Sequence, residues 1–163
     1  MRILGIDPGI AQTGWGVVDA EGQRYRPVSF GVIKTESSLP LEKRIHTIAT
    51  KVGELAEEHG VQAVSMEDIF FAKNISSAIN VAKVIGAVIQ QVAIQRLPVR
   101  LFTPLQIKLA VTGYGTAEKN QVQEMVRLLL KLEKIPASDH AADSLAAAIC
   151  LAANSTTELR MQK

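Results

Sequence analysis

The stretch Ile3-Leu4-Gly5-Ile6-Asp7-Pro8-Gly9 sets the fold that the rest of the chain can adopt. An apolar run ends in one carboxylate and then in a Pro-Gly break, which is the pattern of a buried strand that delivers a side chain to the edge of a sheet. Active sites of open α/β sheets lie at the carboxyl ends of strands. We therefore predict that Asp7 belongs to a functional site.

Apolar patterning around this stretch predicts a mixed α/β domain. Three strands separated by short breaks favour an antiparallel meander, and crossover helices join two later strands to it. The predicted strands are residues 2–7, 13–19, 25–35, 62–69 and 99–102. The predicted helices are residues 40–60, 76–97, a short segment around Ile107 and Lys108, 118–132, and a last helix from Ser138 or Asp139 to about Ala153. Together they predict a three-layer domain with a five-stranded mixed sheet.

Length and composition fit one domain. No Pro-, Gly- or Ser-rich linker divides the 163 residues, and 47% hydrophobic residues with only 4% aromatic ones require an aliphatic core. We expect the domain to cover residues 1–153. Residues 154–163 lack apolar periodicity and are expected to form a disordered tail.

Cysteine usage and hydropathy favour the cytoplasm. The single cysteine, Cys150, lies in an alanine-rich run and is expected to be a buried small hydrophobe, so no disulfide framework exists. The N-terminus enters the first strand without a leader peptide. The longest apolar window is interrupted by Lys83, Gln90, Gln91 and Gln95, so we expect no membrane span.

Basic residues gather in the middle of the chain, although the formal net charge is only +2. Between Phe70 and Lys134 the acids are Glu118, Glu124 and Glu133, and the basic residues are Lys73, Lys83, Arg96, Arg100, Lys108, Lys119, Arg127, Lys131 and Lys134. Cations around an acidic site suit a nuclease, because cations hold phosphates while carboxylates hold metals. The alternative for any single lysine is a solvated helix face.

The predicted helix over residues 76–97 has more apolar positions than one core-facing stripe needs. It must therefore bury a second face, either inside its own domain or against a second copy of the chain. We favour a homodimer.

Carboxylates and one histidine in later segments predict partners for Asp7. Glu67 and Asp68 are adjacent on a strand, so alternation allows only one of them to share a site with Asp7. His140 and Asp143 are three residues apart on a helix and hence on one face, and Asp139 competes for that face. The constellation predicts a two-metal phosphodiesterase site in which Asp7 bridges the ions. A histidine ligand suits manganese better than magnesium, and His140 alternatively orients or protonates.

Several motifs closely resemble the RuvC family of bacterial Holliday-junction resolvases, and the resemblance extends from Met1 to about Ala153. The segments that carry it are Gly5-Ile6-Asp7-Pro8-Gly9, Thr13-Gly14-Trp15-Gly16, Met66-Glu67-Asp68-Ile69-Phe70-Phe71-Ala72-Lys73-Asn74, Thr103-Pro104, Lys108, Val111-Thr112-Gly113-Tyr114-Gly115, Ala117-Glu118-Lys119, Gln121-Val122 and His140-Ala141-Ala142-Asp143-Ser144-Leu145-Ala146. It implies a ribonuclease H-like fold and a homodimer that makes paired symmetric nicks in four-way junction DNA. It also implies two Mg²⁺ ions per site, which Mn²⁺ can replace, and RuvA and RuvB as partners.

The resemblance also assigns roles to residues. It implies that Glu67, rather than Asp68, joins Asp7, His140 and Asp143 in a metal-binding catalytic quartet, although many members have an aspartate where His140 stands. The residues that it and the local pattern mark for DNA contact are Phe70, Lys73, Lys108, Tyr114 and Lys119. An aromatic side chain can stack on an unpaired base, and a lysine can stabilise charge on a phosphate. Phe70 or Phe71 could instead belong to the core, and Tyr114 could mark a plain turn.

Three other functions are compatible with parts of the sequence. Asp7-Pro8-Gly9 followed by Thr13-Gly14 also resembles the phosphate loop of actin-like ATPases and sugar kinases, but those need two such domains. Other ribonuclease H-like enzymes share the metal carboxylates but lack the Phe70–Asn74 and Gly113–Gly115 segments. A junction-binding module without activity is disfavoured, because converging carboxylates repel phosphate.

Overall fold

A mixed five-stranded β-sheet forms the centre of the molecule. The computed structural model describes residues 1–69 and 75–161, with side chains through Ser155. The strands are β1 (Arg2–Asp7), β2 (Gln12–Glu21), β3 (Arg24–Lys34), β4 (Ala63–Glu67) and β5 (Val99–Phe102), in the order β3-β2-β1-β4-β5. β2 pairs antiparallel with β1 and β3, whereas β4 pairs parallel with β1 and β5. The predicted antiparallel meander and the two crossover strands are confirmed.

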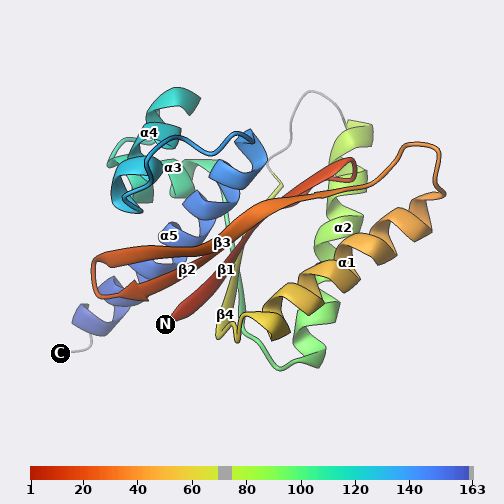
Figure 1. Cartoon of the computed structure of the whole chain (residues 1–163), viewed down its shortest axis with the longest axis horizontal. Coiled ribbons are helices and arrows are strands. Elements are labelled where there is room, and N and C mark those ends of the chain that lie inside the picture. Colours follow the sequence, from red (N-terminus) through yellow and green to blue (C-terminus); the bar gives the residue numbers. More distant parts are fainter. Residues whose placement is uncertain (70–74, 162–163) are drawn as a thin grey trace.

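Helices cover both faces of the sheet, as Figure 1 shows. α1 and α2 lie on one face, while α5 lies across the other with α3 and α4 packed against it. The helices are α1 (Leu41–Glu58), α2 (Ile75–Ile94), α3 (Pro104–Thr112), α4 (Lys119–Leu129) and α5 (Asp139–Met161). The predicted three-layer α/β architecture is therefore confirmed.

The last helix is longer than the sequence predicts. We placed its end near Ala153, whereas α5 continues to Met161. Polar side chains at this point bond back to the helix: Asn154 donates to the carbonyl oxygen of Cys150 at 2.8 Å, and Ser155 donates to that of Leu151 at 2.9 Å. Such bonds let polar residues continue a helix without apolar periodicity. The boundary of the domain at residue 153 stays a prediction.

The sheet separates two apolar clusters, because neighbouring residues on a strand face opposite sides. On β1, Ile3 belongs to the cluster under α3, α4 and α5, whereas Leu4 and Ile6 belong to the cluster under α1 and α2. All three side chains are fully buried. The core is aliphatic, as the composition predicts.

Glycines on the strands let α5 lie directly on the sheet. A Cβ atom at Gly5 would lie 1.9 Å from the carbonyl oxygen of Ser144, and one at Gly14 would lie 1.9 Å from that of His140. At Gly16 it would lie 2.6 Å from the side chain of Leu145. A side chain at these positions would collide with α5. The absence of side chains at the three glycines therefore lets α5 pack directly on the backbone of the strands.

The outer side of α2 exposes three isoleucines together with the polar residues Lys83 and Gln90. Ile75, Ile79 and Ile94 are 70%, 50% and 67% exposed, while Val84 and Val88 on the opposite side of the helix are fully buried. Among the described residues α2 is the one helix long and apolar enough to cross a membrane, so our expectation that no window reaches this level is wrong. Length and composition alone are weak support for a span, because core helices pass the same test.

Candidate active site

Asp7 and Glu67 stand at the carboxyl ends of two adjacent parallel strands. β1 and β4 pair with Gly5 opposite Ser65 and Ile6 opposite Met66, so the next residue on each strand is a carboxylate. Ser65 faces α5, since its hydroxyl donates to the carbonyl oxygen of Ala147 at 2.6 Å. Glu67 lies two residues further and therefore faces α5 as well. This register gives a physical reason for Glu67 rather than Asp68 on this face.

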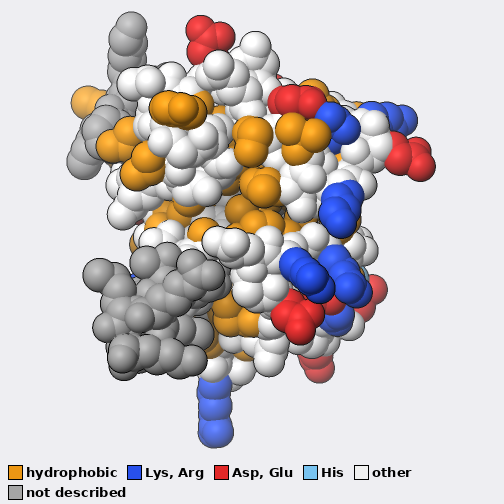
Figure 2. Space-filling model, turned by 90° about the vertical axis from the view of Figure 1, so that its left-hand side faces the viewer, with side chains coloured by type: hydrophobic (Ala, Val, Ile, Leu, Met, Phe, Trp, Pro, Cys, Tyr) orange, Lys and Arg blue, Asp and Glu red, His pale blue; other side chains and the backbone are white. Residues whose placement is uncertain are grey.

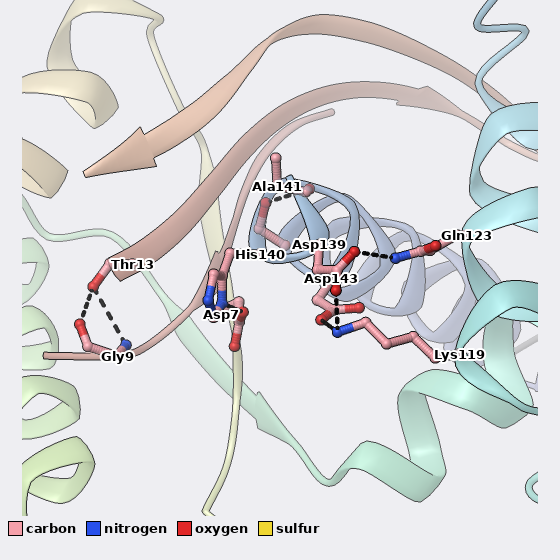
Figure 3. Close-up of polar contacts among 10 residues, drawn as sticks. Asp7, Gly9, Thr13, Lys119, Gln123, Asp139, His140, Ala141 and Asp143 are labelled. Atoms are coloured by element: carbon pink, nitrogen blue, oxygen red, sulfur yellow. Dashed lines mark hydrogen bonds and ion pairs between the residues drawn. The ribbon is translucent and has the colours of Figure 1, made fainter. Parts of the chain in front are cut away.

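α5 brings His140 and Asp143 to the same place. The glycine contacts hold the first turns of α5 on the strands, and His140 Nδ1 lies 2.6 Å from Asp7 Oδ2. In Figure 3 the two side chains meet between β1 and α5, with Asp143 beside them. The electrostatic fields of Asp7 and Asp143 both act on Glu67. The four residues of the expected quartet thus lie in one cluster.

Lys119 joins this cluster from the first turn of α4. Its ammonium lies 3.4 Å from Asp143 Oδ2 and 3.1 Å from Asp139 Oδ2. Gln123 Nε2 donates to the other oxygen of Asp139 at 2.8 Å (Figure 3). The sequence predicts only competition between Asp139 and Asp143 for a helix face. It does not predict that Asp139 holds Lys119, because the approach of α4 to α5 is a tertiary contact.

Burial raises the pKa values of the three clustered carboxyls. For Asp7, burial raises the pKa, and the hydrogen bond from His140 and the charges of His140 and Lys119 oppose the rise. The pKa of Glu67 rises from 4.5 to about 7, first by burial and then by the charges of Asp7 and Asp143. Burial also raises the pKa of Asp143, and Lys119 opposes it. Negative charge in the cluster is therefore only partly balanced.

A pocket of about 200 Å³ opens beside the carboxylates. Glu67 and Asp143 line it together with Lys108 of α3 and Lys119 of α4. Two carboxylates and two lysines therefore share one small pocket, whose other lining residues are apolar. A phosphate bound in this pocket would contact Lys108 and Lys119 while it lies next to Glu67 and Asp143.

The loop after β1 is fixed by Thr13. This buried side chain donates from Oγ1 to the carbonyl oxygen of Gly9 at 2.7 Å and accepts from the amide of Gly9 at 3.3 Å (Figure 3). The amide and the carbonyl of Gly9 are thereby both tied to β2. Asp7 lies two residues before Gly9 and pairs with Gly14 of β2, so β2 restrains the backbone at and after Asp7.

Of the remaining candidates for DNA contact, the structure describes Tyr114 alone. Tyr114 is 73% exposed and lines an open pocket of about 800 Å³ with Glu118 and Met125, and it does not line the pocket beside Glu67. Phe70 and Lys73 lie outside the described residues. Their proposed roles stay predictions.

Some basic residues form ion pairs with acids on their own or a neighbouring element. Arg127 pairs with Glu124 at 2.6 Å along α4, and Arg2 pairs with Asp19 at 2.8 Å. Figure 2 shows Lys and Arg side chains mixed with Asp and Glu along one side of the end that it views. For Arg127 the solvated helix face is therefore the better interpretation.

The donor set of the cluster fits a divalent cation. Carboxylate oxygens are the ligands that magnesium and manganese prefer, and a cation would relieve the repulsion that raises the pKa of Glu67. Within residues 1–69 and 75–161, no three His, Cys, Asp or Glu side chains form a ready metal centre. The side chains of His140 and Lys119 instead hold Asp7 and Asp143.

Sheet order and acid placement together define a class of protein, the nucleases of the ribonuclease H-like fold. Shared ancestry explains both features, since the model of the family described as crossover junction endodeoxyribonuclease RuvC matches residues 3–151. The chain belongs to the RuvC family, whose members are metal-dependent nucleases.

Relatives match over nearly the whole chain. The crossover junction endodeoxyribonuclease RuvC of Brevibacillus brevis is 48% identical over 149 residues, which cover 91% of this chain and 90% of the relative. The Thermus thermophilus RuvC structure is 35% identical with a TM-score of 0.90 and covers 97% of both chains. The structure of T. thermophilus RuvC in complex with Holliday junction substrate is 34% identical with a TM-score of 0.92, and covers 97% of this chain and 96% of that one. These matches do not favour the kinase-like, ribonuclease or binding-module alternatives.

Proposed function

We propose that this protein is a structure-selective endonuclease that resolves four-way DNA junctions by paired, symmetric, metal-dependent nicks in opposing strands. The observation that carries the proposal is the convergence of Asp7, Glu67 and Asp143, from two strand ends and a helix, next to two lysines. Membership in the RuvC family supports the junction as the substrate. A purely binding protein would gain nothing from acids that repel DNA.

Asp7, Glu67, His140 and Asp143 would hold two Mg²⁺ ions in each site, and Mn²⁺ would be able to replace them. Bound there, the pair of ions would supply activation of water and neutralisation of the leaving oxygen. Lys119 must then give up its contact with Asp143, which leaves it bound to Asp139 and free to face a phosphate. Because His140 bonds Asp7 through Nδ1, its Nε2 is the ring atom available to ligate or to carry a proton.

Lys108 and Lys119 are proposed to contact the phosphate at the cut. Both line the pocket that Glu67 and Asp143 also line. An ammonium at this position attracts the anionic backbone and balances charge that develops on the phosphate. Phe70, Lys73 and Tyr114 are also proposed to contact DNA, on the strength of the family resemblance, with Phe70 stacking at the centre of the junction.

Paired nicks need two sites, and we propose a homodimer formed through α2. The exposed isoleucines at positions 75, 79 and 94 on its outer side support this, because an apolar helix face of this kind is covered in a stable protein. Ile79→Glu should give a monomer in light scattering. Leu128→Glu, at an exposed residue of α4, is the matched control and should leave the dimer intact. A dimer in the Ile79→Glu variant would place the interface elsewhere.

Family membership supports two further proposals. RuvA and RuvB are proposed as partners that move the junction before it is cut. The protein is proposed to act in the cytoplasm, where the single buried Cys150 would need no oxidising environment.

The test incubates the protein and its Asp7→Asn variant with a labelled four-way junction, a duplex of matched sequence and an RNA–DNA hybrid, in Mg²⁺, Mn²⁺ or EDTA. Symmetric nicks in the junction alone, dependent on metal and lost in the variant with binding retained, are the expected result. Cleavage of the hybrid would instead favour a ribonuclease. A junction that is bound but uncut in every metal would mean that the protein only binds.

A further inference from the structure

A second polar groove adjoins the acid cluster, and neither Lys108 nor Lys119 lines it. It has a volume of about 720 Å³, and its lining includes Gln12 and Lys34 as well as Asp139 and His140. The pocket beside Glu67 lies toward α3 and α4, whereas this groove lies toward β2 and β3. His140 lines the groove and contacts Asp7 of the cluster, so the groove borders the acid cluster.

The strand register fixes which way Gln12 and Lys34 face. They are direct partners in the antiparallel pair of β2 and β3, so their side chains share one face of the sheet. Gly14, two residues after Gln12, faces the carbonyl oxygen of His140. Because residues two apart on a strand face the same side, Gln12 and Lys34 stand beside the first turn of α5.

The charge of this groove suits an anion. Among the described residues, the ammonium of Lys34 makes no hydrogen bond or ion pair, and Lys34 is exposed. Asp139 is the acid of the lining, but its carboxylate is held by Lys119 at 3.1 Å and by Gln123 at 2.8 Å. The groove therefore offers one unpaired cation and one amide donor, with its acid already compensated.

We propose that Lys34 and Gln12 form a phosphate subsite for the strand that is cut. The inference rests on the proposed nuclease function: when a phosphodiester lies at Asp7 and Glu67, the same strand must leave the cluster through the space on either side. Lys108 and Lys119 contact it on one side, and Lys34 and Gln12 bind the phosphate of a neighbouring nucleotide on the other. Phosphate contacts on both sides of the acid cluster would fix the position of the strand and thereby determine which phosphodiester bond is cleaved.

The contact of Lys34 with this phosphate would position the DNA strand and take no part in the cleavage step. Loss of one lysine–phosphate contact lowers the dependence of log affinity on log salt by about 1. Lys34→Ala should therefore weaken junction binding by about fivefold in moderate salt and reduce the salt dependence by that amount. Lys34→Arg keeps the cation and should restore most of the affinity.

The deciding experiment pairs variants with modified junctions. The cut bond is first mapped with the unmodified protein, and junctions are then made with one uncharged methylphosphonate at each of three positions on either side of it. Affinity is measured with the non-cleaving Asp7→Asn protein, with and without Lys34→Ala. Lys51→Ala removes the same charge from an exposed position on α1 and is the control.

At one position, the uncharged phosphate and Lys34→Ala should each weaken binding about fivefold, and together they should weaken it no further. Gln12→Ala should show a smaller effect at the same position. Additive losses at every position, or an equal loss in Lys51→Ala, would overturn the subsite while leaving junction cleavage by the unmodified protein intact. If that protein neither binds nor cuts junctions, the proposed function fails and the subsite fails with it.

Discussion

Replacement of Glu67 by Gln should stabilise the metal-free protein at alkaline pH while abolishing cleavage. The pKa of Glu67 rises from 4.5 to about 7 in the folded chain. A raised carboxyl pKa means that the folded state holds its proton more tightly than the unfolded state. Its stabilising contribution is therefore complete below pH 4.5 and is lost as the pH rises to about 7.

The magnitude follows from the shift. At about 1.4 kcal/mol per pKa unit, ionisation of Glu67 lowers the free energy of unfolding by at most about 3.5 kcal/mol above pH 7. Part of this cost belongs to Asp7 and Asp143, whose charges titrate together with that of Glu67. Gln keeps the size of the side chain and never ionises, so the variant avoids the loss. With a denaturant slope of roughly 2 kcal/mol per molar urea, its midpoint at pH 8 should exceed that of the unmodified protein by about 1 to 1.5 M.

The assay is urea unfolding in EDTA at pH 4.5, 6, 7 and 8. The two proteins should unfold alike at pH 4.5 and diverge through pH 7. Asp68→Asn removes the same charge from the adjacent residue, whose carboxylate accepts from the amide of Ile69, and should show a much smaller gain. Mg²⁺ at pH 8 should stabilise the unmodified protein but not Glu67→Gln, since binding to the folded state alone raises stability. Parallel pH curves for both proteins would refute the assignment of an uncompensated charge to this position.

Three further predictions concern the contacts that build the site. Gly14→Ala should lose about 1–3 kcal/mol of stability and most cleavage, because the added methyl would collide with the backbone of α5; a variant with native stability and activity would contradict this, and urea unfolding with a junction-cleavage assay measures both. Ser65→Ala removes the buried bond to Ala147 and should cost about 1–3 kcal/mol in urea unfolding, whereas a change below 0.5 kcal/mol would show that the bond contributes little. Asp139→Asn should release Lys119 and lower the single-turnover cleavage rate about tenfold with junction affinity retained; an equal loss of affinity would mean that it acts in binding.

Several parts of the site could be predicted from local sequence. The apolar run before a Pro-Gly break predicts that Asp7 lies at the end of a strand. Helix spacing predicts that His140 and Asp143 lie on one helix face. The pattern could not choose between Glu67 and Asp68 by itself, because alternation fixes only that they face opposite sides. The register of β4 on β1 shows that Glu67, and not Asp68, faces the same side of the sheet as Asp7.

Other features depend on contacts between distant segments. The ion pair between Lys119 and Asp139 forms because α4 packs against α5. The local sequence of neither helix predicts this contact. The end of α5 was misplaced because hydrophobic periodicity stops at Ala153, although Asn154 bonds the helix and lets it continue. Apolar excess on α2, in contrast, was visible in the sequence and does remain exposed on the single chain.

The two apolar clusters on either side of the sheet have a consequence for how such a protein can change over generations. The proposed cleavage site lies on the side that holds α5, whereas the surface proposed to meet a second copy lies on the side that holds α1 and α2. Adjacent residues on a strand face opposite sides of the sheet. A substitution that faces one side therefore leaves the packing on the other side undisturbed. Catalysis and assembly can therefore drift separately within one small chain, and an engineer could alter one of them while keeping the other fixed.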